Sequence, residues 1–209
     1  MTPQYFKSLG RPRSLPVSNL RRVLKFRLVQ TVLGGFRKEI GRRARAEQPD
    51  QIRVFPQPGY QWKKPVAVSK LAGPLVARGF TDLGPYRIGA MPEVTVQFLV
   101  NPTVSVYACV YEHATAGIWL DLVSRYEDGS RVTFTTVRSN GSDQRPQDTV
   151  VRAPSASSET LYGRMLRERP QRTLLPIDAV TVLRLFEAAS AEQGLWRKTE
   201  GSRPRGQQT

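Results

Sequence analysis

Cysteine and histidine are almost absent from this chain of 209 residues, which holds one cysteine, Cys109, and one histidine, His113. A single cysteine excludes an internal disulfide and a cysteine-based metal cluster. A single histidine excludes a histidine cluster that could hold a metal ion. We therefore expect no cofactor. One cysteine is also compatible with a reducing compartment, so we expect a cytoplasmic protein.

Long hydrophobic runs and familiar catalytic motifs are missing as well. The longest apolar stretch near the start, Leu28 to Phe36, is flanked by Arg27 and Arg37 and is far shorter than a membrane-spanning helix, which needs ~20 residues. The sequence holds no P-loop, no dinucleotide-type glycine motif, no GxSxG and no HExxH. The sequence therefore predicts no transmembrane segment, and the hypothesis of an enzyme is weakened without being excluded.

The positive charge is concentrated at the two ends of the chain. The net charge is +15, but residues 46–196 hold 16 Lys and Arg against 15 Asp and Glu. Residues 1–45 hold 12 Lys and Arg against a single acid, Glu39, and residues 197–209 hold four against one. A near-neutral domain between two basic ends is a different object from a uniformly basic nucleic-acid-binding domain.

Length, prolines and charge together predict the domain organisation. With 209 residues, of which 39% are hydrophobic, the chain can form one domain with a core, plus tails. We predict four parts: a basic, partly helical N-terminal arm over residues 1–45, a proline-rich linker over 46–65, an α+β domain over 66–196 and a basic disordered tail over 197–209.

Residues 93–137 carry the strongest structural signal. Turn residues at Asn101-Pro102, at 114–117 and at Asp128-Gly129 divide this stretch into four segments. Within each segment hydrophobic residues alternate with other residues, which is typical of strands that bury one face. A short strand over residues 86–90 precedes them. The sequence therefore predicts an antiparallel β-meander of about five strands.

One face of the predicted sheet is aliphatic. Its residues are Val94, Val96, Phe98, Val100, Val104, Val106, Ala108, Val110, Ile118, Leu120, Leu122, Val132 and Phe134. We expect helices over residues 66–77, 157–169 and 178–196 to cover this face. The predicted fold class is therefore α+β, with helices packed on one face of the meander and a basic N-terminal arm in addition.

The opposite face combines aromatic and charged residues and is the candidate ligand or partner face. It carries Tyr107, Tyr111, Trp119, Asp121, Arg125 and Arg131. Aromatic side chains on an open sheet face can stack on a ligand or anchor a partner protein. Two other interpretations stay open. A helix or the N-terminal arm covers the aromatic residues, or Asp121 forms a cross-strand ion pair instead of serving as a catalytic acid.

Cys109 and His113 lie on the same predicted strand face, which raises the question of a nucleophile and its base. Four residues along a strand span ~13 Å, because each residue advances ~3.3 Å. A direct hydrogen bond between the two side chains is therefore excluded without a bulge. A packed cysteine and a turn histidine explain the pattern better, so we predict no catalytic residue and no metal ligand.

The excess of positive charge in the N-terminal arm predicts that it contacts an anionic surface, either nucleic acid or acidic lipid. A plain solvated tail and a targeting segment are the alternatives that stay open. The cations of the predicted contact are Arg21, Arg22, Lys25, Arg27, Arg37, Lys38, Arg42, Arg43 and Arg45.

Several stretches of the chain, among them GPYRIGAMPEV, VYEHATAGIWLDLVSRYEDGSRVTFTT and LYGRMLRERP, resemble a bacterial domain family of uncharacterised proteins. The resemblance covers about residues 70–200 and leaves residues 1–65 outside. The family has no assigned activity and no assigned catalytic residues, so the resemblance implies neither for this chain.

These observations favour a non-catalytic binding or scaffold module. Its basic arm would contact an anionic partner, and its amphipathic sheet face would bind a protein or a small ligand. One alternative is an enzyme with a pocket on the face of Tyr107, Tyr111, Trp119 and Asp121. Another is a peripheral membrane protein anchored by residues 19–45. A pocket that encloses Asp121 and perturbs its carboxylate would favour the enzyme.

Overall fold

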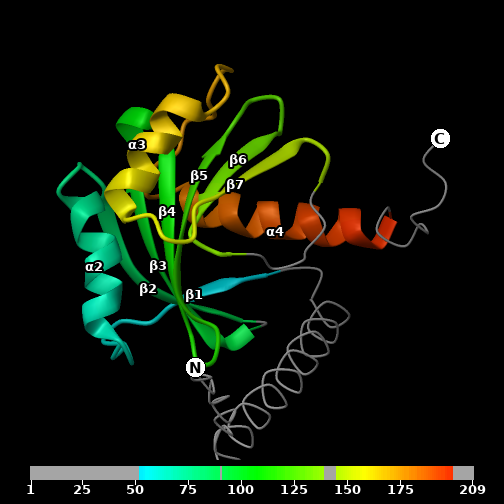
Figure 1. Ribbon diagram of the computed structural model, residues 1–209. Coiled ribbons are helices and arrows are strands. Elements are labelled where there is room, and N and C mark those ends of the chain that lie inside the picture. Colours follow the sequence, from blue (N-terminus) through cyan, green and yellow to red (C-terminus); the bar gives the residue numbers. More distant parts are fainter. Residues whose placement is uncertain (1–51, 90, 139–144, 200–209) are drawn as a thin grey trace, which may run out of the picture. The chain divides into compact units, whose positions relative to one another are not determined.

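The structure is a computed structural model that describes residues 52–89, 91–138 and 145–199, all of them within one compact unit of residues 48–209. Seven strands form a single sheet in which spatial order follows chain order (Figure 1). The strands are β1 (Val54–Pro56), β2 (Thr81–Ile88), β3 (Met91–Asn101), β4 (Val106–His113), β5 (Gly117–Arg125), β6 (Arg131–Thr135) and β7 (Asp148–Arg152). The α-helices within the described ranges are α2 (Pro65–Val76), α3 (Ser158–Glu168) and α4 (Val182–Thr199).

The sheet is mostly antiparallel, which confirms the predicted α+β class. Strands β1 to β6 pair antiparallel with their neighbours, and β7 pairs parallel with β6. The sheet has seven strands rather than about five, because short strands are added at both edges. One of them, β1, lies within the segment 46–65 for which the prolines predicted a linker, and it pairs with β2 from Val54 to Pro56.

The helices begin where the sequence supplies the chemistry for it. Pro65 occupies the first turn of α2, where a missing backbone N–H does no harm. Ser157 caps α3, and its hydroxyl accepts a hydrogen bond from the Thr160 N–H at 3.2 Å. Ahead of α4, the Asp178 carboxylate accepts from the backbone N–H of Val180 and Thr181 at 2.9 and 2.7 Å.

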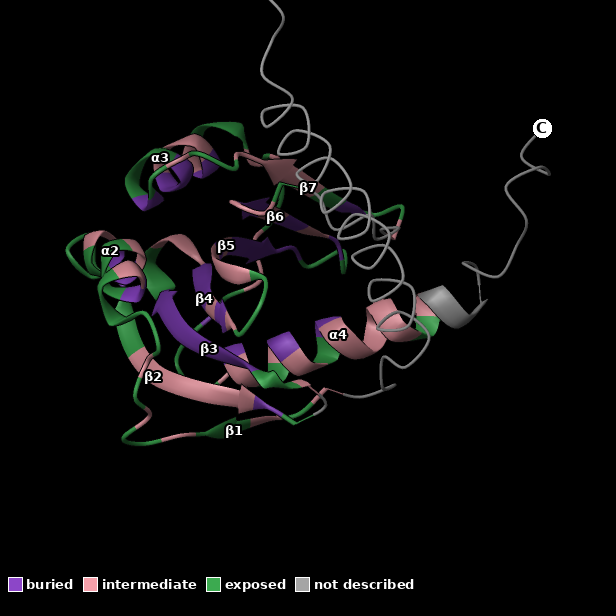
Figure 2. Cartoon of the chain, turned by 60° about the horizontal axis from the view of Figure 1, so that its bottom comes forward, coloured by how far each residue is buried: buried purple, intermediate pink, exposed green. Residues whose placement is uncertain are grey.

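Helices α2 and α3 cover one side of the sheet, here called the α2/α3 face (Figures 1 and 2). The residues of α2 and α3 in this core include Leu75, Leu161 and Met165, each fully buried. They pack on side chains that alternate along the strands, as the sequence predicted for this stretch. The strand residues of this core are Leu99, Val106, Ala108, Val110, Leu120, Leu122, Val132 and Phe134.

Helix α4 lies on the opposite side, here called the α4 face, so the prediction that the helices pack on one face is wrong for this helix (Figure 2). The Phe186 ring meets the Phe98 ring edge to face, with centroids 5.0 Å apart. The buried Arg125 also donates a hydrogen bond to the Leu185 carbonyl oxygen of α4 at 3.0 Å. The sheet is therefore the middle layer of three.

The predicted face of β3 is also wrong. Val96, Phe98 and Val100 belong to the core under α4 rather than to the α2/α3 face. The reason is the register, in which Phe98 pairs with Cys109, so even-numbered residues of β3 share a face with odd-numbered residues of β4. A single turn of 3₁₀ helix, Pro102–Val104, and Ser105 with a positive φ of 50° make this connection.

Two predictions about the ends of the chain concern residues that the structure covers in part or not at all. The nine cations assigned to an anionic partner and the possible membrane anchor over residues 19–45 lie outside the described residues. Residues 200–209 of the predicted tail also lie outside them, while α4 extends to Thr199. Within the described part of the chain, no helix combines the length and the hydropathy needed to span a bilayer.

Candidate functional site

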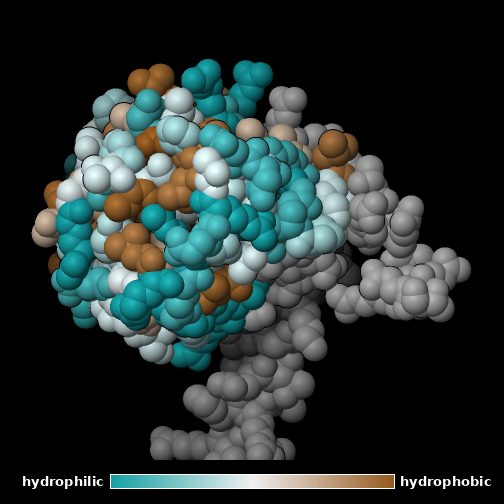
Figure 3. Space-filling model, turned by 90° about the horizontal axis from the view of Figure 1, so that it is seen from above, coloured by the Kyte–Doolittle hydropathy of each residue, from teal (hydrophilic) through white to brown (hydrophobic). Residues whose placement is uncertain are grey.

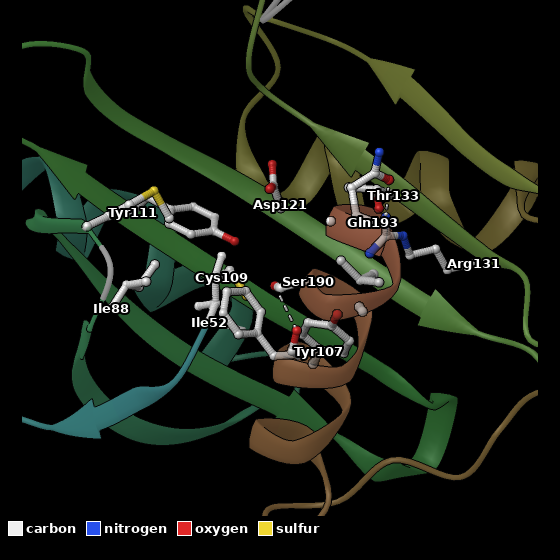
Figure 4. Close-up of a pocket in the computed structure, with 15 residues that line it drawn as sticks. Ile52, Ile88, Tyr107, Cys109, Tyr111, Asp121, Arg131, Thr133, Ser190 and Gln193 are labelled. Carbon is white, nitrogen blue, oxygen red and sulfur yellow. Dashed lines mark hydrogen bonds between the residues drawn. The ribbon is translucent and has the colours of Figure 1, made fainter. Parts of the chain in front are cut away.

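A pocket of about 280 Å³ lies between α4 and the sheet, and we call it the α4 pocket (Figure 4). Its lining comes from the five consecutive strands β2 to β6, from Ile52 ahead of β1, and from α4, which is far from these strands in the sequence, so the pocket exists only in the folded chain. Its lining residues are Ile52, Ile88, Met91, Tyr107, Cys109, Tyr111, Asp121, Val123, Arg131, Thr133, Phe186, Ala189, Ser190, Gln193 and Gly194.

Strand alternation places the floor of the pocket. Tyr107, Cys109 and Tyr111 follow one another at every second position of β4, so their side chains point to the same side. Cys109 pairs with Asp121 across β4 and β5, and Val123 of β5 pairs with Thr133 of β6. Polar and apolar side chains from three adjacent strands are thereby brought onto one surface.

Helical periodicity places the roof. Phe186, Ala189, Ser190 and Gln193 recur at spacings of three, one and three residues, which puts them on one face of α4. The Ser190 hydroxyl donates to the Phe186 carbonyl oxygen at 2.9 Å (Figure 4). Because that bond uses its hydrogen, the Ser190 oxygen faces the pocket mainly as an acceptor.

Asp121 is the most unusual group in the pocket. Its Oδ1 atom is out of contact with solvent and has no hydrogen-bond donor among the described residues. Burial raises the pKa of Asp121 from 3.8 to about 6, against the opposing effects of a hydrogen bond from Thr135 and the positive charge of Arg131. The carboxylate is therefore ionised at neutral pH but gains a proton in mildly acidic solution.

The other acidic groups of the pocket, one thiol and two tyrosine hydroxyls, stay protonated. Burial raises the pKa of the Cys109 thiol and of the Tyr107 and Tyr111 hydroxyls, and the negative forms of their neighbours raise them further. Cys109 is therefore a neutral, packed thiol at physiological pH, and the chemistry of an activated cysteine nucleophile is not supported here.

The positive charge of the pocket is already balanced. Arg131 Nη2 lies 2.8 Å from Asp148 Oδ2, and the Asp148 side chain is only 1% exposed. The same guanidinium nitrogen donates to Gln193 Oε1 of α4 at 3.2 Å. Arg131 therefore links β6, β7 and α4. Its charge is paired within the protein and is not available to bind a ligand.

A second ion-pair group fixes α4 next to the pocket. Glu192 of α4 accepts from Arg125 at 3.0 Å and forms a very short contact with Arg145. Burial opposes the ionisation of Glu192, but these two arginines outweigh it and lower the pKa of the carboxyl. The roof of the pocket is thus held to the sheet by charge as well as by the Phe186 contact.

The residues of the candidate face predicted from the sequence do not all line the pocket. Tyr107, Tyr111, Asp121 and Arg131 line the pocket, whereas Trp119 and Arg125 do not. Trp119 stacks on Tyr111 with ring centroids 4.8 Å apart and planes inclined by 15°. Arg125 is buried and serves to hold α4.

His113 does not take part in the pocket. It ends β4, and its Nδ1 accepts hydrogen bonds from the backbone N–H of Thr115 and Ala116, each at 3.0 Å. This is the turn role that the sequence favoured. Within the described residues, no three His, Cys, Asp or Glu side chains are grouped so that they could hold a metal ion.

Sequence reasoning missed the α4 side of the pocket. Ser190 and Gln193 carry no signal of their own, because polar residues on a helix are usually solvated. The available signal was their position on the same helical face as Phe186 and Ala189. That face would have identified them only if the side of the sheet covered by α4 had been known.

Comparisons with known proteins add no information about this site. No family model matches the chain, and neither a curated protein nor a solved structure matches it. The resemblance to an uncharacterised bacterial family likewise brings no functional residue to the α4 pocket.

Proposed function

We propose that this protein is a binding module that takes a small organic ligand into the α4 pocket. The observation that carries the proposal is a partly enclosed pocket of about 280 Å³ with a mixed lining. Apolar side chains, namely Ile88, Met91, Val123 and Phe186, line it together with the polar groups of β4, β5 and β6. Ligand sites in proteins typically combine an apolar lining with a few convergent polar groups.

The size of the pocket suits a small molecule. A cavity of ~150 Å³ in another protein accepts benzene, so a pocket of about 280 Å³ can hold one ring or branched chain with a polar group. A protein partner fits less well, because α4 covers the sheet face and leaves Tyr107 only 2% exposed. On the surface seen in Figure 3, hydrophobic residues form small groups among hydrophilic ones rather than one broad patch.

The test is ligand-observed NMR with a library of small fragments and the full chain. A fragment that binds the α4 pocket should no longer bind to the variant Ser190→Phe, in which the added ring fills the pocket. Ala188→Phe adds the same ring at an exposed position of the same helix, outside the pocket, and should leave binding unchanged. Equal binding of all fragments to both variants, or no binding to the unaltered chain, would contradict the proposal.

An enzyme that uses acid–base catalysis is the second candidate, favoured by one specific observation. Asp121 combines a pKa of about 6 with a place in the pocket beside Tyr111, and a carboxylate with a pKa near the working pH is suited to move protons. The enzyme would show turnover that is lost in Asp121→Asn and has a limb near pH 6, whereas the binding module would show saturable binding without turnover.

The proposal also includes the basic arm, which we expect to contact an anionic surface. The charge asymmetry supports it, since 12 of the 32 Lys and Arg lie within residues 1–45. Neutralising the nine arm cations to Gln should abolish salt-sensitive binding to a DNA duplex or to phosphatidylserine vesicles. Neutralising the exposed Arg167 and Arg184 of the domain is the control. Unchanged binding of the arm variant would remove the arm from the proposal.

A further inference from the structure

The α4 pocket presents two ionised side chains, and they differ in what they already contact. Arg131 is paired with Asp148 at 2.8 Å and also donates to Gln193. Asp121 has one oxygen, Oδ1, that is shielded from solvent and has no donor among the described residues. A buried carboxylate oxygen without a donor is unfavourable, because it has lost its hydration and gained nothing in return. The pocket therefore lacks one hydrogen-bond donor, at Asp121.

The neighbours of Asp121 do not supply that donor. Cys109 pairs with Asp121 from β4 and Thr135 pairs with it from β6, but neither donates a hydrogen bond to Oδ1. The remaining polar side chain of the roof at this end, Ser190, has its hydrogen directed at Phe186 (Figure 4). A ligand can complete the site by bringing the donor itself.

We infer that the ligand of the α4 pocket is a small organic amine, whose protonated nitrogen lies against the Asp121 carboxylate and whose hydrophobic group lies against the apolar side chains of the lining. The inference rests on the proposed function and names its ligand class. A cationic donor satisfies the hydrogen bond and neutralises the charge at once, which a neutral hydroxyl does only in part. An anionic ligand is disfavoured, because Asp121 repels it and Arg131 is already paired.

The hydrophobic part of the ligand follows from the apolar side chains that line the pocket. Ile88, Met91, Val123 and Phe186 line the pocket together with Ala189 of α4. Next to them the volume of about 280 Å³ leaves room for one six-membered ring or a branched aliphatic group. An amine with a single such group is therefore expected to bind better than a polyamine, whose second charge would meet this apolar surface.

The inference predicts a pH dependence of its own, because a protonated amine and an ionised Asp121 must be present together. Affinity should rise from pH 5 to pH 7 as Asp121 loses its proton, and then level off. The other groups that face this site keep their charge over that interval. Tyr107, Cys109 and Tyr111 have raised pKa values and stay neutral, Glu192 has a lowered pKa and stays negative, and the guanidinium groups of Arg125, Arg131 and Arg145 stay positive. The remaining charged side chain nearby, Asp148, lies 2.8 Å from Arg131.

The experiment compares three probes that share one ring: benzylamine, benzyl alcohol and benzoate. Binding to the full chain is measured by isothermal titration at pH 7.5 and pH 5. We expect benzylamine to bind most tightly, and its Kd to rise at least about tenfold in Asp121→Asn, which keeps the shape and removes the charge. Asp121→Ser, which also removes the charge, is the second variant and should raise the Kd of benzylamine in the same way. The control is Asp128→Asn, the same change at an exposed hairpin carboxylate outside the pocket.

The outcomes separate this inference from the proposed function. Tighter binding of benzoate or benzyl alcohol, or a benzylamine Kd that Asp121→Asn leaves unchanged, overturns the amine inference. If such binding is still abolished by Ser190→Phe and not by Ala188→Phe, the pocket remains a ligand site of another class. If none of the three probes binds and no fragment is sensitive to Ser190→Phe, both the inference and the proposed function are wrong.

Discussion

Two carboxylates lie on adjacent strands and on opposite sides of the sheet, and their surroundings differ completely. Glu112 of β4 is on the α2/α3 face and is 3% exposed. Its Oε2 accepts from the Tyr60 hydroxyl and the Lys63 N–H, each at 3.1 Å, and its Oε1 accepts from the Lys64 N–H at 2.8 Å. Asp121 of β5 is on the α4 face, and its Oδ1 accepts nothing.

The hydrogen bonds of Glu112 stabilise the folded chain, whereas burial of the Asp121 carboxylate opposes folding. Glu112 receives three donors from the segment that leads into α2, and its negative charge lies beside the N-terminus of that helix. Both oxygens of Glu112 are therefore satisfied within the chain. The α4 face has a pocket and an incompletely bonded carboxylate, which is where the proposed ligand would bind.

The largest expected effect compares the packing of the two faces. Phe134→Ala removes a fully buried ring from the α2/α3 face and should lower the free energy of unfolding by about 3–5 kcal/mol. Met91→Ala, which removes a half-buried side chain from the pocket wall, should lower it by only about 1 kcal/mol. Urea unfolding followed by circular dichroism measures both. Equal losses would show that the α4 face is as tightly packed as the other.

The next substitution is expected to stabilise the protein rather than to destabilise it. Asp121→Asn should raise the free energy of unfolding at pH 7.5 by up to about 3 kcal/mol, since its pKa rises from 3.8 to about 6 on folding. The folded state binds the extra proton between these two values, so the ionised carboxylate destabilises the fold above pH 6 and has no effect below pH 4. Thermal unfolding of both proteins from pH 4 to 8 tests this. A constant difference across that range would contradict it.

Glu112→Gln should act in the ordinary direction and lower the free energy of unfolding by about 1–3 kcal/mol, because charge-assisted hydrogen bonds are lost. Tyr60→Phe removes one of the three donors and should cost about 1 kcal/mol or less. Hydrogen exchange should show the first turn of α2 opening first. A gain in stability in Glu112→Gln would remove the contrast between the two carboxylates.

The smallest expected effect sharpens the description of the pocket itself. Tyr111→Phe removes a hydroxyl from the lining of the pocket but keeps the ring that stacks on Trp119. We expect a loss of about 1 kcal/mol at most and unchanged near-ultraviolet circular dichroism. Trp119→Leu should alter that spectrum by removing the stacked pair. A large loss of stability in Tyr111→Phe would mean that the hydroxyl supports the fold.

Much of the fold follows from local patterns. The alternation along β4, β5 and β6 placed Tyr107, Tyr111, Asp121 and Arg131 on one face, and the register confirms that they share it. The helices predicted over residues 66–77 and 157–169 agree with α2 and α3 within one or two residues at each end. These features depend on neighbours in the sequence, which is why the sequence alone is sufficient for them.

The remaining features depend on long-range contacts. Both faces of β3 are buried, with Leu99 and Gln97 on one and Val96 and Phe98 on the other, so alternation could not say which face was which. Arg125 looks like a surface cation in the sequence, but in the structure it is buried and donates a hydrogen bond to the Leu185 carbonyl oxygen of α4. The roof of the pocket was unpredictable for the same reason.

The short connection from β3 to β4 decides the orientation of a whole strand. Its four residues, Pro102 to Ser105, fix which set of β3 side chains looks towards α4. An insertion of one residue there would rotate β3 by half a turn about its axis, presenting Thr95, Gln97 and Leu99 to Phe186 and turning Phe98 towards α2. The tolerance of this protein to length changes should therefore be lowest at a surface turn, where most folds accept them readily.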